Sequence, residues 1–339
     1  MANTIDKVTA SAEEMGPIIE GGQQSTSEEP APRYSFVTLA LRNLLYIILY
    51  LFCGPSLILI NNKILRQYNF PFPMILSGFG LMTTATVCLL LVCTGCVKLE
   101  HGDLVTRQFF VRNLLPVGAA LAMTYATGNA VYLYLPVGFI QMLKAFTPAT
   151  TLAMLWLFAI ETPTWRVLAS VMVICMGTAL ASVGEGSLNP IGLLLMLTAE
   201  VSEAMRLVLT QKLLQNLRFG VIEGQVWLAP TSALWLFSAA AIHELPRLLR
   251  TEAWRIPLAN PLPFVASSIL GFAVAFATFL VIKATNSVTL KVLGTARSAG
   301  LVVWSAVVLG ERITPLELAG YSLSLCAFAA YNVFKVQGR

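Results

Sequence analysis

Ten apolar stretches of about 20 residues each follow one another along this chain of 339 residues. An α-helix needs about 20 apolar residues to cross the hydrocarbon core of a bilayer, so each stretch is long enough to span a membrane. Only 12% of the residues are charged, against about 25% in ordinary soluble domains. The predicted spans cover residues 39–61, 72–95, 113–134, 137–160, 164–184, 190–211, 225–242, 263–283, 287–309 and 315–335. The sequence therefore predicts an all-α polytopic membrane protein with ten transmembrane helices.

The fourth span, 137–160, contains a lysine, Lys144, about a third of the way along its length. A charged ammonium group at this depth costs about 2.5–3.5 kcal/mol on insertion scales, so it needs water, a partner or an anionic ligand. The alternative is that the long side chain reaches the membrane interface along its own stem. The ninth span, 287–309, carries a second cation, Arg297, in the corresponding region.

The two halves of the chain correspond at an offset of 150 residues. Glu161 matches Glu311 and Thr164 matches Thr314, and the spans with Lys144 and Arg297 occupy the same place in each half. Because each half has five spans, the second must enter the membrane upside down relative to the first, as an inverted repeat. We therefore expect a tail over 1–35, a first repeat over 36–186 and a second over 187–337. Lys144 and Arg297 would then approach one central cavity.

The sixth span adds a third candidate cation, Arg206. Glu203 lies three residues before it, where the two side chains can form an ion pair that needs no ligand. The other interpretation places Arg206 in the cavity, with Glu200 or Glu203 holding it in position. Lys144, Arg206 and Arg297 together suit a phosphomonoester, which carries a charge of about −1.5 to −2. A loaded site would be neutralised and an empty one would stay positive, which favours obligatory exchange of two anionic substrates.

Three further residues are candidate ligands of the substrate. Gln141, one turn before Lys144, and Asn129 in the third span can bind sugar hydroxyl groups, and Lys291 lies near the start of the ninth span. No catalytic dyad, phosphate-binding glycine loop, metal cluster or cofactor motif is recognisable, and no nucleic acid partner is expected. Cys93 and Cys96 have the spacing of a redox or metal pair, but no second pair accompanies them.

Charge distribution bears on topology and location. The first 34 residues carry a net charge of −4 and the remainder +9, which favours anionic lipids outside or an anionic cargo inside. The tail is polar and is expected to be disordered. It is too acidic for a transit peptide, and the first apolar stretch begins too late for a cleaved signal peptide, so we expect the tail in the cytosol. Ten spans put both termini on the same side. The basic residues of the loops are biased towards that side.

With these residues in view, the chain resembles the triose-phosphate and sugar-phosphate translocator family of the drug/metabolite transporter superfamily, and especially its plant sugar phosphate/phosphate translocators. The stretches that carry the resemblance are Asn62-Lys63, Phe70-Pro71-Phe72-Pro73, Val137 to Ala145 with Pro148, Ser182 to Glu185, Glu203 to Gln211, Leu228-Ala229-Pro230, Thr285 to Arg297, Gly320-Tyr321 and Tyr331-Asn332. The resemblance implies ten helices in two inverted halves, a central site and strict exchange of anions across an organelle membrane. It also implies that Lys144, Arg206 and Arg297 hold the phosphate.

Two departures from the plastid members of this family concern the substrate. Those members have adjacent Lys and Arg in the ninth span, whereas Ser298 follows Arg297 here. They also have a histidine in the third span where this chain has Tyr125. Both differences argue against triose phosphate, and the absence of a transit peptide favours the Golgi or another endomembrane over plastids.

Several functions stay open at this point. The leading one is an antiporter for a phosphorylated sugar, and the first alternative is a Golgi antiporter exchanging a nucleotide-sugar for a nucleotide monophosphate. A membrane-embedded enzyme acting on lipid phosphates lacks the residues for its chemistry. A non-transporting scaffold or receptor of the same fold is the further alternative. Expected partners are the anionic substrate, its counter-substrate and membrane lipids, and a homodimer stays open.

Overall fold

The computed structural model describes residues 36–97, 99, 105–159, 162–186, 188–217, 221–284 and 287–337. The predicted tail, 1–35, lies outside these residues. Within them every regular element is a helix, and no strand occurs. The longer helices are α2 (Phe36–Arg66), α3 (Pro73–Cys93), α5 (Leu115–Ala130), α7 (Thr147–Leu157), α8 (Trp165–Gly184), α9 (Pro190–Leu217), α10 (Val221–His243), α13 (Pro261–Ala284), α14 (Ser287–Val307) and α15 (Pro315–Gln337). The shorter ones are α4 (Arg107–Phe109), the π-helical η2 (Phe110–Leu114), η3 (Val131–Leu133), α6 (Val137–Leu143), η4 (Lys144–Phe146), α11 (Leu245–Arg250) and α12 (Arg255–Ala259).

Six helical segments in the described part of the chain are long and apolar enough to cross a membrane. They cover 41–66, 73–93, 107–133, 165–184, 223–243 and 261–278. Large apolar side chains such as Phe52, Leu157 and Val183 remain exposed on the helices, at 68%, 69% and 77%. Such exposure is what a lipid environment permits, because lipid tails are as apolar as these side chains. The chain is therefore an all-helical polytopic membrane protein.

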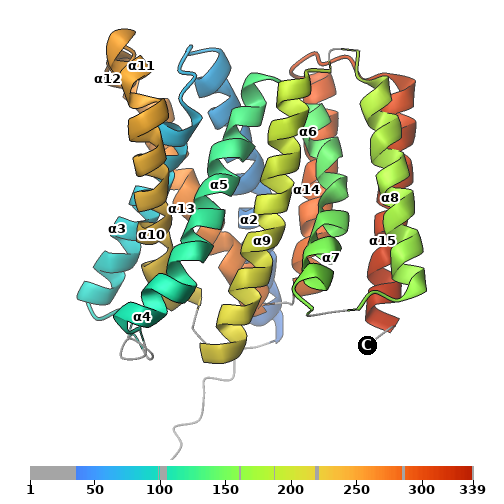
Figure 1. Cartoon of the computed structure of the whole chain (residues 1–339), viewed down its shortest axis with the longest axis horizontal. Coiled ribbons are helices and arrows are strands. Elements are labelled where there is room, and N and C mark those ends of the chain that lie inside the picture. Colours follow the sequence, from blue (N-terminus) through green and yellow to red (C-terminus); the bar gives the residue numbers. More distant parts are fainter. Residues whose placement is uncertain are drawn as a thin grey trace, which may run out of the picture. The chain divides into compact units, whose positions relative to one another are not determined.

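The described residues from 42 onwards form one compact unit in which helices far apart in the sequence pack together. Helix α3 packs against α10, α6 against α14, and α8 against α15, as Figure 1 shows for the last two pairs. Helix α5 packs against both α9 and α10, and α13 packs against α3. Each of the first three pairs joins one helix from before residue 186 to one from after it.

The α8–α15 pair shows why small residues are needed where two helices approach closely. A Cβ atom on Gly177 would lie 2.7 Å from the carbonyl oxygen of Gly320, so only glycine allows these backbones to meet. The hydroxyl of Ser324 donates to the carbonyl of Ile174 across the same contact at 3.2 Å. Small residues and such polar contacts commonly hold membrane helices together.

Two carboxylates cap the starts of distant helices. Glu244, after α10, binds the start of α3, and Glu311, after α14, binds the start of α6. The donors are the backbone N–H groups of Met74 and Ile75 to Glu244, both at 2.9 Å, and of Val137 and Gly138 to Glu311, both at 2.8 Å. The first N–H groups of a helix have no partner inside it, and the helix dipole favours an anion there. Both carboxylates thus join the second half of the chain to the first.

Candidate substrate-binding site

The predicted fourth span, 137–160, is not one continuous helix in the structure. It divides into α6, the 3₁₀ turn η4 that begins at Lys144, and α7. Proline has no N–H, so Pro148 cannot donate the usual hydrogen bond to the carbonyl of Lys144 four residues earlier. The hydroxyl of Thr147 donates to that carbonyl instead, at 2.6 Å. The helix therefore tightens at the residue that carries the positive charge.

Lys144 is half-buried and lies among charged residues from two other helices. It interacts electrostatically with Arg297 of α14 and with Glu200 and Glu203 of α9. Among the described residues the Lys144 ammonium group forms no hydrogen bond and no ion pair. The structure thus brings Lys144 and Arg297 within electrostatic range of each other, and within the described part of the chain neither has a direct anionic partner.

Arg297 is held against α2. Its guanidinium lies over the ring of Tyr50, 5.0 Å from the ring centre, which is the geometry of a cation–π contact. A Cβ atom on Gly54 would lie 2.6 Å from Nη1 of Arg297, so glycine leaves the space that the guanidinium fills. The Nε atom of Arg297 is buried without a hydrogen-bond partner in the described part of the chain. An arginine held in this way has donors available for an incoming anion.

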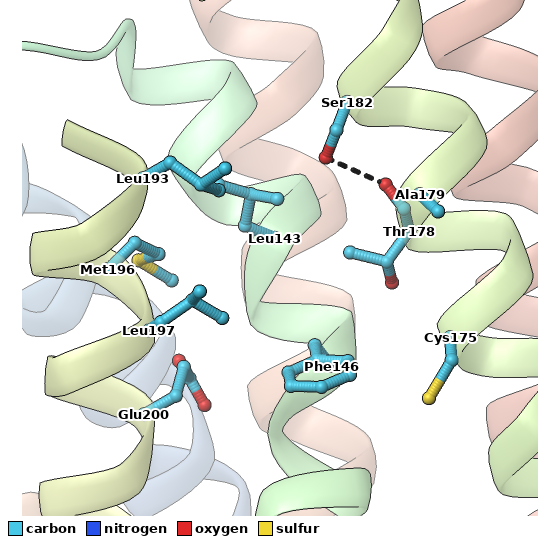
Figure 2. A pocket seen from close by; sticks show the side chains of 10 residues that line it. All are labelled: Leu143, Phe146, Cys175, Thr178, Ala179, Ser182, Leu193, Met196, Leu197 and Glu200. Atoms are coloured by element: carbon cyan, nitrogen blue, oxygen red, sulfur yellow. Dashed lines mark hydrogen bonds between the residues drawn. The ribbon is translucent and has the colours of Figure 1, made fainter. Parts of the chain in front are cut away.

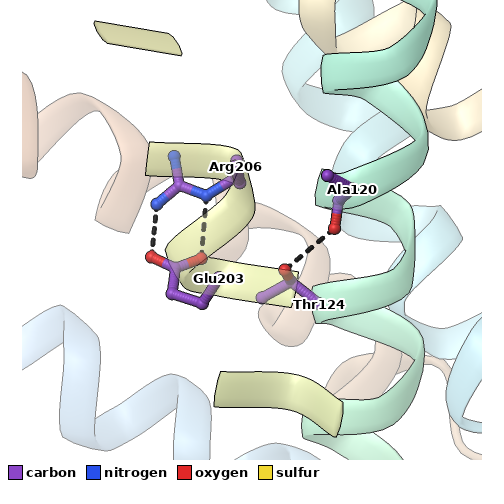
Figure 3. A network of polar contacts seen from close by, with 4 residues as sticks. All are labelled: Ala120, Thr124, Glu203 and Arg206. Carbon is purple, nitrogen blue, oxygen red and sulfur yellow. Dashed lines mark hydrogen bonds and ion pairs between the residues drawn. The ribbon is translucent and has the colours of Figure 1, made fainter. Parts of the chain in front are cut away.

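Arg206 pairs with Glu203 on the same helix, as their spacing predicts. Figure 3 shows the two side chains joined by two contacts, one of them from Nε of Arg206 to Oε2 of Glu203 at 2.8 Å. The side chains remain 25% and 30% exposed, and Tyr125 of the neighbouring α5 interacts with both charges. The ion pair accounts for both residues without a ligand, yet it leaves part of the guanidinium accessible.

The two predicted amide ligands lie in different surroundings. Gln141 is fully buried, and its Oε1 accepts a hydrogen bond at 3.3 Å from Ser298, the residue after Arg297. Its Nε2 has no partner among the described residues. Gln141 is therefore packed beside the Arg297 region of α14, with one amide donor unused.

Asn129 belongs to a network of polar side chains that joins four helices. Its amide donates to the hydroxyl of Ser77 in α3 at 2.6 Å, and its oxygen accepts from Asn61 in α2 at 3.4 Å. Asn61 in turn accepts from Ser267 in α13 at 2.6 Å. The described contacts of Asn129 are with this network and not with the cations. Lys291 belongs to the first turns of α14, and its side chain lies outside the described residues.

A groove of about 340 Å³ lies between α6, η4, α8 and α9, and its lining includes Leu143 and Phe146 on either side of Lys144 in the chain. Figure 2 shows its lining, which consists of Leu143, Phe146, Cys175, Thr178, Ala179, Ser182, Leu193, Met196, Leu197 and Glu200. Glu200 is the only charged residue of this lining and is 6% exposed. Among the described residues, no group of histidine, cysteine or acidic side chains has the arrangement of a metal site.

Sequence reasoning missed Tyr50 and Gly54 as neighbours of Arg297. Their spacing of four places them on one face of a helix, but nothing in the sequence indicates that this face meets α14. The groove next to Glu200 and the cap that Glu311 gives to α6 were missed as well. Each of these features joins different helices, and sequence reasoning does not show how separate helices face one another.

Comparison with known proteins places this arrangement in a family. A family model, described as the triose-phosphate transporter family, matches residues 41–332. The chain belongs to the triose-phosphate transporter family. Like the relatives in this family, it is an integral membrane transporter and not an enzyme.

Individual relatives agree with the family assignment. A probable sugar phosphate/phosphate translocator of Arabidopsis thaliana is 30% identical over 311 residues, which cover 90% of this chain and 88% of that protein. A second protein of the same description and organism is 31% identical over 296 residues, covering 86% and 83%. UDP-galactose transporter 1 of Arabidopsis thaliana is 28% identical over 293 residues, covering 86% and 87%.

A solved crystal structure resembles this triose-phosphate transporter family member in fold. The TM-score is 0.54 at 15% sequence identity, and the likeness covers 88% of this chain and 98% of that chain. At this identity the likeness concerns the fold alone.

Proposed function

We propose that this protein is an antiporter that exchanges a phosphorylated sugar or a related organic phosphate across an organelle membrane. The observation that carries the proposal is the convergence of Lys144 and Arg297 from two distant helices, with no anionic side chain of the described residues in direct contact with either. Arg206 completes the phosphate site. The sugar phosphate/phosphate translocators among the relatives support this class of substrate.

The three cations have different roles in this site. The Lys144 ammonium supplies a compact charge at the break in its helix, whereas the Arg297 fork can bind two phosphate oxygens and is oriented by Tyr50. Arg206 contacts the phosphate with the part of its guanidinium that Glu203 leaves free. Gln141 directs its unused amide donor towards a sugar hydroxyl, and Lys291 at the start of α14 adds positive charge. Asn129 acts indirectly, since its network fixes the helices around the site.

We further propose ten transmembrane helices arranged as two inverted repeats, 36–186 and 187–337, preceded by a tail over 1–35. The packing of α3 on α10, α6 on α14 and α8 on α15 supports this arrangement, because each pair consists of the corresponding spans of the two halves. At a two-fold axis, residues that correspond should meet. Ser324 and Ile174, which are 150 positions apart, do so.

The charge of the empty site favours exchange over one-way transport. Glu203 offsets Arg206 and Glu200 lies near Lys144, so the positive charge of Arg297 is uncompensated when no substrate is bound. An uncompensated charge is costly in a dehydrated, closed site. We therefore expect the carrier to change sides only when it is loaded. Fast net efflux from loaded vesicles would contradict this.

A nucleotide-sugar is the second candidate substrate. Two observations favour it: the relationship to UDP-galactose transporter 1, and the position of Tyr125 beside Arg206 with 39% of its surface exposed. An exposed aromatic ring next to a phosphate-binding cation can stack on a nucleobase. For either substrate we place the protein in the Golgi or another endomembrane, with both termini in the cytosol.

Exchange in vesicles tests the proposal. The purified protein is reconstituted in vesicles preloaded with phosphate, glucose 6-phosphate, triose phosphate, phosphoenolpyruvate, a UDP-sugar or a GDP-sugar, and uptake of labelled counter-substrate is measured. Loss of one charge-assisted hydrogen bond is worth about 1.5–3 kcal/mol, or about 10- to 150-fold in affinity. We expect Lys144→Ala and Arg297→Ala each to raise the KM for an organic phosphate by a factor in this range.

The matched control is Arg255→Ala, which removes a cation that is 65% exposed at the end of the helices. This variant should exchange like the wild type. If exchange survives both Lys144→Ala and Arg297→Ala unchanged, the phosphate site is not where we place it. If only nucleotide-sugars exchange, the second candidate replaces the first.

A further inference from the structure

Glu200 is a buried carboxyl group that the phosphate site itself does not use. It lies on α9, one turn before Glu203, and Figure 2 shows its side chain at one end of the groove between α8 and α9. It is 6% exposed, and its Oε2 has no hydrogen-bond partner among the described residues. An ionised carboxylate in apolar surroundings requires a compensating charge.

That charge comes from Lys144. The groups that face Glu200 or lie beside it are Lys144 of η4, Thr147 of α7, Glu203 of α9, and Cys175 of α8 across the groove. The two nearby tyrosines face other charges. Tyr125 of α5 faces Glu203 and Arg206, and Tyr132 of η3 faces Arg297. Lys144 is the single cation in this set that interacts with Glu200. A second acid, Glu203, interacts unfavourably with it when both are ionised. The ionised state of Glu200 therefore depends on Lys144.

Phosphate binding would remove this support. Among the described side chains of the site, the cations Lys144, Arg206 and Arg297 and the acids Glu200 and Glu203 sum to one positive charge when both acids are ionised. A phosphate dianion would change this to one negative charge. Once the phosphate oxygens bind the Lys144 ammonium group, its charge no longer compensates Glu200. The Glu200 carboxylate then faces an apolar groove and a nearby dianion. Burial and a like charge both favour the neutral form of a carboxyl group. A proton on Glu200 restores neutrality to the loaded site.

We propose that Glu200 is a proton-binding site that takes up a proton when phosphate binds and releases it when phosphate leaves. This inference rests on the proposed phosphate site and adds a co-substrate to it: the carrier moves its dianion together with a proton from water. One O–H bond forms on the Glu200 carboxyl group as the proton donor in the water loses its proton, and the reverse occurs when phosphate leaves. The substrate then crosses in a neutral complex, and exchange of dianions of equal charge is electrically silent.

Isothermal titration calorimetry measures how many protons the protein takes up for each phosphate that it binds. Inorganic phosphate is titrated into the full-length protein in detergent, in buffers of different ionisation enthalpy at one neutral pH. Protons carried by phosphate itself are the same for every variant and cancel in the comparison. We expect the wild type to take up about one proton more per phosphate than Glu200→Gln, which mimics the neutral carboxyl group. Glu252→Gln, which changes an exposed carboxylate, should match the wild type.

The outcomes separate this inference from the function on which it rests. Equal proton counts for the wild type and Glu200→Gln, with phosphate bound by both, overturn the proton site and leave the phosphate site in place. No phosphate binding by the wild type overturns both.

A second measurement avoids the variant altogether. A lipid-soluble carbodiimide reacts with protonated carboxyl groups, and mass spectrometry locates the label in the wild-type protein. Phosphate should increase labelling at Glu200 several-fold and not at Glu203. Labelling of Glu200 that phosphate leaves unchanged or lowers contradicts the inference.

Discussion

Replacing Glu311 by glutamine tests how the two halves of the protein are held together at the start of the helix that leads to Lys144. Helix α6 begins at Val137, and the residue before it, Pro136, offers no side-chain cap. The Glu311 carboxylate supplies that cap from beyond α14, with both oxygens accepting backbone N–H groups at 2.8 Å. Glutamine has nearly the same shape, but its NH₂ group would face one of these N–H donors.

The expected cost follows from these two bonds. Loss of one hydrogen bond to a charged acceptor is worth about 1.5–3 kcal/mol. Loss of the negative charge at a helix N-terminus adds about 0.3–1 kcal/mol. The free energy of unfolding should therefore fall by about 2–4 kcal/mol. For a large domain, each kcal/mol lost from the free energy of unfolding lowers the melting temperature by about 2–4 °C. The melting temperature of Glu311→Gln should therefore fall by about 4–16 °C.

The assay is thermal unfolding of the purified protein in detergent, followed by circular dichroism. The matched control is Glu252→Gln, whose carboxylate is 58% exposed and pairs with Arg255 at 3.0 Å. Exposed ion pairs contribute about 0.2–1 kcal/mol, so this variant should melt within a few degrees of the wild type. If Glu311→Gln melts together with Glu252→Gln, the carboxylate does not stabilise the start of α6 as the geometry requires.

Two other substitutions probe the site and its supporting network. Gly54→Ala places a Cβ atom 2.6 Å from Nη1 of Arg297, so the flexible guanidinium should move away. The affinity for phosphate should then fall about 10-fold, with little change in the melting temperature. Gly128→Ala, where an added Cβ meets nothing within 4 Å, is its control, and equal affinities in the two variants would contradict this account of Arg297. Ser267→Ala removes the donor that Asn61 accepts at 2.6 Å and should lower the free energy of unfolding by about 1–3 kcal/mol. An unchanged denaturation midpoint in detergent would mean that this hydrogen bond adds no net stability.

Contacts along one helix could be predicted from the sequence. The pairing of Arg206 with Glu203 follows from a spacing of three residues, and the structure contains that pair. The break at Lys144 has an equally local cause, since Pro148 removes a hydrogen bond to the Lys144 carbonyl. We predicted a continuous span over 137–160 because the apolar run continues through the proline, and hydropathy does not register a missing N–H group.

Contacts between helices could not be predicted in this way. In water, the apolar face of a helix indicates which side is buried. In a membrane the lipid is as apolar as the protein interior, so a helix such as α5 or α10 can be apolar all round and its sequence does not fix its rotation. Asn129 illustrates this: the sequence makes it one candidate ligand of the substrate, and only the structure shows that its side chain contacts Asn61 and Ser77.

The sequence alone determined that this chain crosses a membrane many times and that cations lie within its spans, because hydropathy and charge belong to each segment by itself. The tertiary structure decided which of those cations meet, that Tyr50 and Gly54 hold Arg297, and that Glu200 borders an apolar groove beside Lys144. These outcomes depend on the rotation and register of separate helices, some of them far apart in the sequence. Packing between whole helices sets that rotation and register.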